Sequence, residues 1–291
     1  MSRRQAAAIE HLQQRLLEAA GPLAPEVRAA FRAVPRHAYV PQFLSGGRPV
    51  EITPENLDAH LPLLYHNGTL LLWQDEARGL CSTISQPTLV LLMLQQLALR
   101  PGQTVFEVGA GSGWNAALLG HLVGPTGRVF SSEIVPEMAA LARASIAAQG
   151  VANVTILSGD GAEGFPPAAP FDRVVFTAGT YDLPAVFHDQ VRAGGLLQLV
   201  LKMRGGGDLL YLLERTADGF EADRGMPCAF VPMLGQYDSS TGPAAALADL
   251  PAAAELSAMR LRIYPAHARV TPQDGEWLVR QRGSQFLWGV K

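Results

Sequence analysis

Residues 105–113 read Val105-Phe106-Glu107-Val108-Gly109-Ala110-Gly111-Ser112-Gly113. A β-rich run enters three glycines at alternate positions, and a helical pattern follows at once. Glycine lets the backbone turn tightly and approach a ligand closely. This order predicts a strand, a ligand-binding loop and a helix. On the glycines alone, an ordinary strand-to-helix turn explains the pattern equally well.

The flanking sequence alternates between helical and β-rich segments. It predicts helices at 87–99, 115–123 and 136–149, and strands at 104–108, 128–131, 154–157, 173–177 and 196–201. Strands that alternate with helices of this length predict an α/β fold, a Rossmann-like parallel sheet with helices on both faces. Such sheets bind ligands at the carboxyl ends of their strands.

The two ends of the chain have a different pattern. Apolar spacing predicts an N-terminal helix and a second helix after Pro25, whereas residues 45–78 have poor periodicity and predict a loop-rich excursion. An Ala-rich stretch at 242–259 predicts a linker and a helix, and alternation beyond it predicts a small β-containing appendage. We therefore expect three parts: 1–80, helical and loop; 81–238, the cofactor-binding core; and 239–291, linker and appendage.

Composition excludes several classes of protein. Of the 291 residues, 48% are hydrophobic and 17% charged, which excludes intrinsic disorder. The formal net charge of −3 argues against a generally basic nucleic-acid binder. The two cysteines cannot make a disulfide framework, and none of the seven histidines forms a metal-ligand motif. We expect no secretion signal, no membrane span, no metal and a cytoplasmic location; the oligomeric state stays open.

Three strand ends carry acidic residues that fit one ligand. Trp114 stands where a dinucleotide fingerprint has its third glycine, which argues against NAD. Glu107, before the first glycine, suits a positively charged ligand without pyrophosphate, such as S-adenosylmethionine. Glu133 could accept hydrogen bonds from both ribose hydroxyls, and Asp160 from the adenine amino group. Taken singly, a solvated surface acid is the competing, less favoured explanation for Glu133, and Asp160 is only part of a turn.

Several segments carry a family resemblance. They are Val34-Pro35-Arg36-His37, Tyr39-Val40-Pro41, Thr83-Ile84-Ser85-Gln86-Pro87, the glycine loop, Gly159-Asp160-Gly161, Pro170-Phe171-Asp172, Gly194-Gly195 and Phe230-Val231-Pro232. From about residue 34 to 235 the sequence resembles the protein-L-isoaspartate O-methyltransferase family. Other class I methyltransferases share the glycine loop but lack the Thr-Ile-Ser-Gln-Pro segment.

The resemblance implies transfer of a methyl group from S-adenosylmethionine to the α-carboxylate of an L-isoaspartyl residue in a damaged protein or peptide. The ester then collapses to a succinimide, whose hydrolysis restores some aspartate. It implies Ser85 as the catalytic residue. Implied cofactor contacts are Ser82, Thr83, Ile84, Ser85, Glu107, Gly109, Ala110, Gly111, Glu133, Ile134, Asp160, Gly161 and Thr177.

The residue types suit this chemistry. A carboxylate with a pKa of roughly 3.5 is ionised at neutral pH, so the acceptor needs no general base. Catalysis then rests on alignment, for which effective molarity supplies about 7–11 kcal/mol. The Ser85 hydroxyl and the free N–H groups of the helix that begins at Pro87 could hold the acceptor carboxylate. A simple helix cap is the competing explanation for Ser85.

Two segments depart from the family pattern. Residues 177–184 and 199–202 replace the usual Thr-Ala-Ala-Pro and Leu-Pro-Val-Gly, and both border the acceptor side. This leaves a specialised aspartyl O-methyltransferase acting on a ribosomally made peptide as an alternative. A non-catalytic cofactor-binding relative and a nicotinamide oxidoreductase are further alternatives, the latter disfavoured by Trp114. Arg36 could attract an acidic acceptor, although a solvated arginine is the commoner case.

Overall fold

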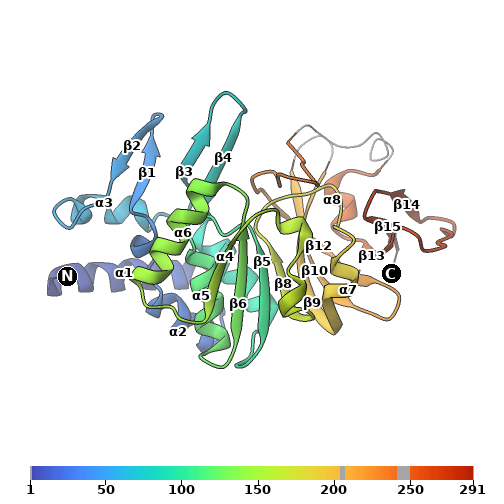
Figure 1. Ribbon diagram of the computed structural model, residues 1–291, viewed down its shortest axis with the longest axis horizontal. Coiled ribbons are helices and arrows are strands. Elements are labelled where there is room, and N and C mark those ends of the chain that lie inside the picture. The colour runs from blue at the N-terminus through green and yellow to red at the C-terminus, as the bar shows by residue number, and fades with distance from the viewer. Residues whose placement is uncertain (1, 204–206, 241–249, 291) are drawn as a thin grey trace. The chain divides into compact units, whose positions relative to one another are not determined.

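Residues 104–123 form the strand β5 (Thr104–Val108), a glycine loop and the helix α5 (Trp114–Val123) (Figure 1). The computed structural model describes residues 2–203, 207–240 and 250–290. Its contacts divide the chain into two units. Unit 1 comprises Met1–Gln103 and Ala110–Ser158, and unit 2 comprises Thr104–Gly109 and Gly159–Lys291. The chain therefore passes from one unit to the other inside the glycine loop.

Unit 1 contains most of the helices. They are α1 (Arg3–Ala19), α2 (Pro25–Ala33), η1 (Arg36–Tyr39), α3 (Leu57–Leu64), α4 (Pro87–Leu97), α5 and α6 (Pro136–Ala148). The helices α2, α4 and α6 each begin at a proline, whose fixed φ suits the first turn. The strands β6 (Arg128–Glu133) and β7 (Val154–Ser158) pair in parallel, as the alternation predicts.

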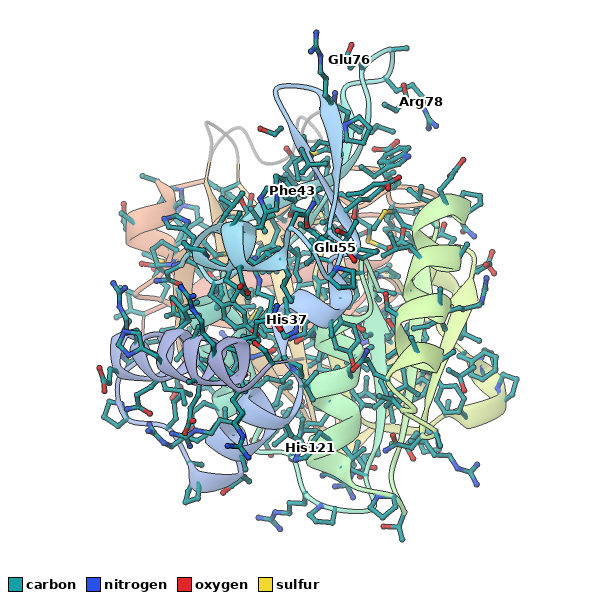
Figure 2. The ribbon with its side chains drawn as sticks, turned by 90° about the vertical axis from the view of Figure 1, so that its left-hand side faces the viewer. His37, Phe43, Glu55, Glu76, Arg78 and His121 are labelled. Atoms are coloured by element: carbon teal, nitrogen blue, oxygen red, sulfur yellow. The ribbon has the colours of Figure 1, made fainter. Side chains whose placement is uncertain are left out.

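The predicted loop-rich excursion at 45–78 is wrong. The segment holds the helix α3 and contributes to two hairpins, β1 (Gln42–Ser45) with β2 (Arg48–Glu51) and β3 (Leu70–Asp75) with β4 (Leu80–Ile84). Gly46 and Gly47 both have positive φ, which the tight turn between β1 and β2 requires. Most residues of these four strands are exposed or half-buried, so the strands lack the buried apolar run that marks β5 and β8. In Figure 2, Glu76 and Arg78 mark the tip of the β3–β4 hairpin.

Unit 2 is built on a mixed sheet in the order β14-β15-β13-β11-β10-β9-β8-β5, with β12 on β10. Its strands are β5, β8 (Phe171–Phe176), β9 (Val191–Lys202), β10 (Asp208–Arg215), β11 (Phe220–Ala222), β12 (Gly225–Cys228), β13 (Arg260–Pro265), β14 (Trp277–Arg280) and β15 (Ser284–Gly289). β8 pairs in parallel with β5 and β9, and the other ladders described within unit 2 are antiparallel. The helices α7 (Phe187–Gln190) and α8 (Ala253–Leu256) and the 3-10 turns η2 (Gly161–Glu163) and η3 (Pro166–Ala168) are short.

The predicted β-containing appendage is confirmed. β13 pairs with β11, so β13, β15 and β14 extend the sheet of unit 2. Of the Ala-rich stretch, residues 241–249 lie outside the described residues, and helix forms at Ala253–Leu256. The α/β class predicted from the alternation is confirmed, while the division at residues 80 and 238 stays a prediction.

Buried aromatic rings pack together in the interior of unit 2. In unit 2, Phe106, Phe171, Phe176 and Phe187 are at most 1% exposed, with ring centroids 5.1–6.0 Å apart. Such tilted and edge-to-face pairs add about 0.5–1.5 kcal/mol each beyond their buried area. Phe106 and Phe171 lie on the parallel strands β5 and β8. The aromatic packing therefore fixes the strands whose carboxyl ends carry the predicted site residues.

Candidate active site

Glu133 is held by the backbone of unit 1. It ends β6, is 8% exposed, and accepts hydrogen bonds from the N–H groups of Gly111 (2.8 Å) and Val135 (3.0 Å). Burial raises the pKa of Glu133, and the N–H groups of Val135, Gly111 and Ile134 oppose that rise. Each carboxylate oxygen keeps a further lone pair, so the group can still accept hydroxyl donors. The carboxylate is thus oriented before any ligand binds.

The Thr-Ile-Ser segment lies beside the same loop. A Cβ added at Gly111, where φ is +52°, would lie 3.7 Å from the Thr83 carbonyl oxygen and 3.9 Å from Ser82 Oγ. Ala110 donates its N–H to the carbonyl oxygen of Ser132 at the end of β6. Unit 1 therefore brings together Ser82, Thr83, Ala110, Gly111 and Glu133, of which Ser82 and Thr83 were linked to the site only through the resemblance.

Trp114 is structural, as its position at the start of α5 indicates. It is 1% exposed, and its indole Nε1–H donates to the Val34 carbonyl oxygen at 3.1 Å. Its ring meets that of Phe31 edge-on at 6.1 Å. Trp114 anchors the start of α5 to the end of α2, which positions the glycine loop.

Arg36 is neither solvated nor available to an acceptor, so both sequence-based explanations are wrong. Its side chain is fully buried and donates to the carbonyl oxygens of Leu64, Gly68 (3.1 Å), Ile84 (3.3 Å) and Ser85 (3.1 Å). Desolvation lowers the pKa of Arg36 to about 10, which leaves it charged at neutral pH. The guanidinium therefore supports the backbone of Ile84 and Ser85.

The start of α4 does not support the explanation of Ser85 as a simple helix cap. Its N-cap is Gln86, whose own side chain makes no capping hydrogen bond, so Ser85 does not serve as the cap. The Thr88 N–H donates to Asn67 Oδ1 at 3.2 Å, so one of the N–H groups expected to be free is already engaged. Sequence reasoning missed Asn67, which lies 21 residues from Thr88 along the chain.

In unit 2, Thr177 sits against Gly109. The Thr177 hydroxyl lies 2.6 Å from the Gly109 carbonyl oxygen and 2.9 Å from that of Val108, and it can donate a hydrogen bond to either of them. Gly109 has φ +98°, and an added Cβ would lie 2.5 Å from Thr177 Oγ1. Glu107, two residues before Gly109, is fully buried on β5. Unit 2 thus brings Gly109 and Thr177 into direct contact.

Asp160 is oriented by two backbone donors in unit 2. Its Oδ1 accepts from the N–H of Ala162 (2.9 Å), and its Oδ2 accepts from that of Gln236 (2.7 Å). A Cβ added at Gly235, where φ is +90°, would lie 2.3 Å from Oδ2. The buried Gly161 begins η2 directly after Asp160. Gln236 is 76 residues away along the chain, which is why no local pattern revealed it.

Asp182 is a second residue that sequence reasoning missed. It is 7% exposed, and its Oδ2 accepts from the Gly283 N–H at 2.6 Å. Burial raises the pKa of Asp182 to about 7, opposed by the N–H groups of Gly283, Leu183 and Ser284 and by the Arg282 charge. A carboxyl that titrates near neutral pH makes this contact sensitive to protonation.

The pKa of Asp182 predicts a pH-dependent stability. The ordinary value of 3.8 applies to the unfolded chain and about 7 to the folded one, so the folded chain binds more protons in between. The unfolding free energy of the wild type should therefore fall, relative to that of Asp182→Asn, as pH rises from about 4 to 7. The difference should reach at most about 4 kcal/mol. Urea unfolding across this range measures it, and parallel curves for the two proteins would contradict the burial argument.

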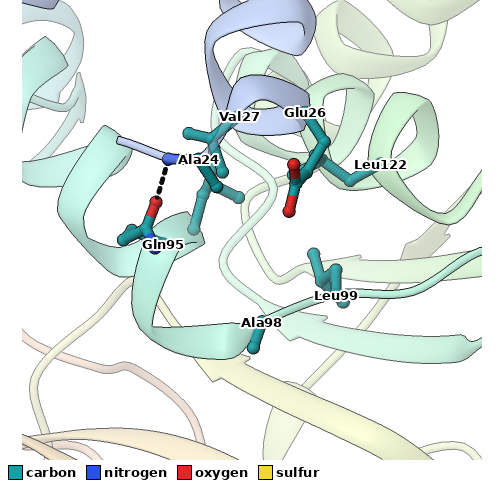
Figure 3. Close-up of a pocket in the computed structure, with 8 residues that line it drawn as sticks. Ala24, Glu26, Val27, Gln95, Ala98, Leu99 and Leu122 are labelled. Carbon is teal, nitrogen blue, oxygen red and sulfur yellow. Dashed lines mark hydrogen bonds between the residues drawn. The ribbon is translucent and has the colours of Figure 1, made fainter. Parts of the chain in front are cut away.

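A pocket in unit 1 lies away from these residues. It is lined by Ala24, Glu26, Val27, Leu94, Gln95, Ala98, Leu99 and Leu122 (Figure 3). The Ala24 N–H donates to Gln95 Oε1 across it at 2.7 Å. Leu122 is near the C-terminal end of α5, whereas the glycine loop precedes its N-terminal end. We assign the pocket no role in the candidate site.

The described residues contain neither a candidate membrane span nor a candidate metal site. No described helix is long and apolar enough to cross a membrane. Within the same residues, no group of three or more His, Cys, Asp or Glu side chains could hold a metal ion. The residues present offer carboxylates, hydroxyls and backbone N–H groups, which suit an organic cofactor with ribose and amino groups.

Comparison with known proteins gives the family. The family model of protein-L-isoaspartate(D-aspartate) O-methyltransferase matches residues 7–238. The chain belongs to this family. A protein-L-isoaspartate O-methyltransferase of Ignicoccus hospitalis is 37% identical over 209 residues, which cover 72% of this chain and 89% of the relative. That of Methanopyrus kandleri is 38% identical over 229 residues, which cover 78% of this chain and 91% of the relative.

Solved structures share the family fold. A protein-L-isoaspartate O-methyltransferase superposes with a TM-score of 0.69 at 20% identity, covering 97% of this chain and 88% of its own. A putative family member from Plasmodium falciparum, solved with S-adenosyl-L-homocysteine, gives 0.61 at 18% identity and covers 78% and 98%. The class I methyltransferase fold predicted from the sequence is confirmed.

Proposed function

We propose that this family member transfers a methyl group from S-adenosylmethionine to the α-carboxylate of L-isoaspartyl residues in damaged proteins or peptides. Family membership over residues 7–238 supports the reaction. The assignment of the cofactor rests on Glu133, whose carboxylate accepts hydrogen bonds from the Gly111 and Val135 N–H groups beside the glycine loop. A buried acid with spare lone pairs is suited to a pair of vicinal ribose hydroxyls.

Each proposed cofactor contact follows from a local feature. In unit 1, the Gly111 and Ile134 N–H groups face the Glu133 carboxylate, Ser82 and Thr83 lie beside Gly111, and Ile84 and Ala110 are their neighbours in sequence. In unit 2, we assign the adenine amino group to Asp160 and the positively charged end to Glu107. Gly109, Gly161 and Thr177 shape the backbone beside these two acids. The bound cofactor supplies an electrophilic methyl group on a sulfonium.

Ser85 is our candidate for holding the acceptor carboxylate. Its carbonyl oxygen is bound to the buried Arg36 guanidinium, so the backbone that carries the hydroxyl is rigidly supported. The acceptor carboxylate is ionised at neutral pH, so Ser85 needs only to donate a hydrogen bond and keep the attacking oxygen in line. No proton is moved in this step.

Replacement of Ser85 tests this role. Ser85→Ala should lower kcat/KM for a synthetic isoaspartyl peptide by about 10- to 100-fold, because one positioned donor is lost. Its affinity for S-adenosylhomocysteine should stay within about twofold of wild type. Labelled methyl transfer and calorimetry measure the two effects, and Ser45→Ala, at an exposed serine on β1, is the matched control. Equal loss of turnover and cofactor affinity would contradict an acceptor role.

One observation favours an alternative methyl acceptor, a normal aspartyl carboxylate. The two segments that depart from the family pattern pair with each other: Thr180 donates its N–H to the Val200 carbonyl oxygen, and Lys202 donates its N–H to that of Thr180. The Lys202 side chain lies against Gly179 and forms an ion pair with Asp208 at 3.0 Å. A diverged acceptor edge suits an aspartyl carboxylate in a ribosomally made peptide. Turnover of normal aspartyl peptides in preference to isoaspartyl ones would support this alternative.

A further inference from the structure

The turn that joins β14 to β15, residues 281–283, contacts a loop far from it in sequence. Gly283 donates its N–H to Asp182 Oδ2 at 2.6 Å, and the next residue, Ser284, has its hydroxyl 2.9 Å from the Leu183 carbonyl oxygen. The contacting residues are 101 positions apart along the chain. The family match ends at residue 238, so the turn lies outside the part of the chain that defines the family.

The close approach depends on glycine. A Cβ added at Gly283 would lie 2.4 Å from the Leu183 carbonyl oxygen and 2.7 Å from the Tyr237 hydroxyl. The Ser284 hydroxyl has one proton, and donation to Leu183 leaves its oxygen to accept from His188 Nε2 at 2.9 Å. Burial lowers the pKa of His188 to about 4, which agrees with a neutral ring that donates through Nε2.

The loop held by this turn begins at the carboxyl end of β8. Thr177, the first residue after β8, contacts the Gly109 carbonyl oxygen, and Asp182 follows five residues later. Thr180 Oγ1 donates to the Asp182 carbonyl oxygen at 2.9 Å, which makes the loop a compact turn. Ligands of parallel sheets bind at the carboxyl ends of strands, so this loop is where an acceptor is expected.

The same turn also contacts the segment that orients Asp160. The Arg282 guanidinium donates to the Gln236 carbonyl oxygen at 3.3 Å and lies over the Tyr237 ring at 5.5 Å. The N–H of Gln236 in turn donates to Asp160 Oδ2. One turn therefore touches both the loop after β8 and the segment that fixes the proposed adenine-binding carboxylate.

We propose that the β14–β15 turn is a positioning element for ligand binding. Its contact with Asp182 holds the loop after β8 in place for the acceptor, and its Arg282 holds the Gln236 segment that orients Asp160. This extends the proposed function and rests on it for the identity of the ligands. Neither residue is assigned to the reacting atoms. They act through Leu183 and Asp160, respectively.

The acceptor part is tested by two variants of Asp182. Asp182→Ala removes the acceptor for the Gly283 N–H and should raise KM for the isoaspartyl peptide about tenfold or more, with kcat changed much less. Asp182→Asn keeps an oxygen at this place and should restore KM to within about threefold of wild type. Melting temperatures are recorded for both. Loss of stability in Asp182→Ala with an unchanged KM would make the contact merely structural and overturn the proposal.

The cofactor part is tested without an acceptor. Arg282→Ala should weaken S-adenosylhomocysteine binding about three- to tenfold in calorimetry, because the Gln236 segment loses its support. Arg280→Ala is the matched control, since this exposed arginine on β14 donates to the Val270 carbonyl oxygen. Equal affinities for both variants would overturn this part. If the wild type binds S-adenosylhomocysteine but methylates no isoaspartyl peptide, the proposed function fails, and the Arg282 result alone decides the positioning role.

Discussion

Gly109→Ala is expected to weaken S-adenosylhomocysteine binding by about 10- to 100-fold and to destabilise the protein. At φ +98° a side chain is strained, which costs about 1–3 kcal/mol. The added Cβ would also lie 2.5 Å from Thr177 Oγ1. That hydroxyl contacts the Gly109 carbonyl oxygen, so relief of the clash disturbs the contact that shapes the end of β5. Calorimetry and thermal unfolding measure the two effects.

Gly102→Ala is the matched control for backbone strain outside the glycine loop. Gly102 has a similar φ of +86°, but its nearest neighbour would be Thr126 Oγ1 at 3.7 Å, an ordinary contact. This variant carries the backbone strain without the clash and should bind S-adenosylhomocysteine like the wild type. If both variants lose affinity to the same degree, the effect is not specific to the glycine loop, which would contradict the role given to Gly109.

Arg36→Leu is expected to cost about 3–5 kcal/mol of unfolding free energy. The substitution leaves the carbonyl oxygens of Leu64, Gly68, Ile84 and Ser85 without their shared donor. An unsatisfied buried polar group costs about 1–3 kcal/mol, and partial rearrangement keeps the sum below the simple total. Denaturant unfolding measures the loss, and KM for the isoaspartyl peptide should rise because Ser85 loses its support.

Two further variants interpret the Arg36 result. Arg36→Lys keeps the charge but cannot reach four carbonyl oxygens with one ammonium group. Its free energy of unfolding should therefore lie between those of the wild type and Arg36→Leu. Arg32→Leu removes an exposed arginine that donates to Gln14 Oε1, and it should change stability by less than about 1 kcal/mol. An Arg36→Leu protein as stable as Arg32→Leu would contradict the supporting role.

Periodicity was sufficient for the long, regular elements. The stretch around Phe106 has a β-rich run entering glycines, and structure gives β5 and α5 there. The hairpins that replace the predicted excursion at 45–78 escaped this reasoning because their strands are largely exposed or half-buried and lack the continuous buried run of β5 and β8. Their strands are defined by cross-strand hydrogen bonds, which leave little trace in such a pattern.

Sequence by itself determined the α/β class and the acidic and glycine-rich strand ends, because strand and helix periods and turn residues are local properties. Tertiary structure alone decided what holds those strand ends. Arg36 reaches four carbonyl oxygens, Gln236 fixes Asp160, and Gly283 binds Asp182 across 101 residues. A buried donor or acceptor must find a partner wherever the fold offers one, and that partner's position in the sequence is unconstrained.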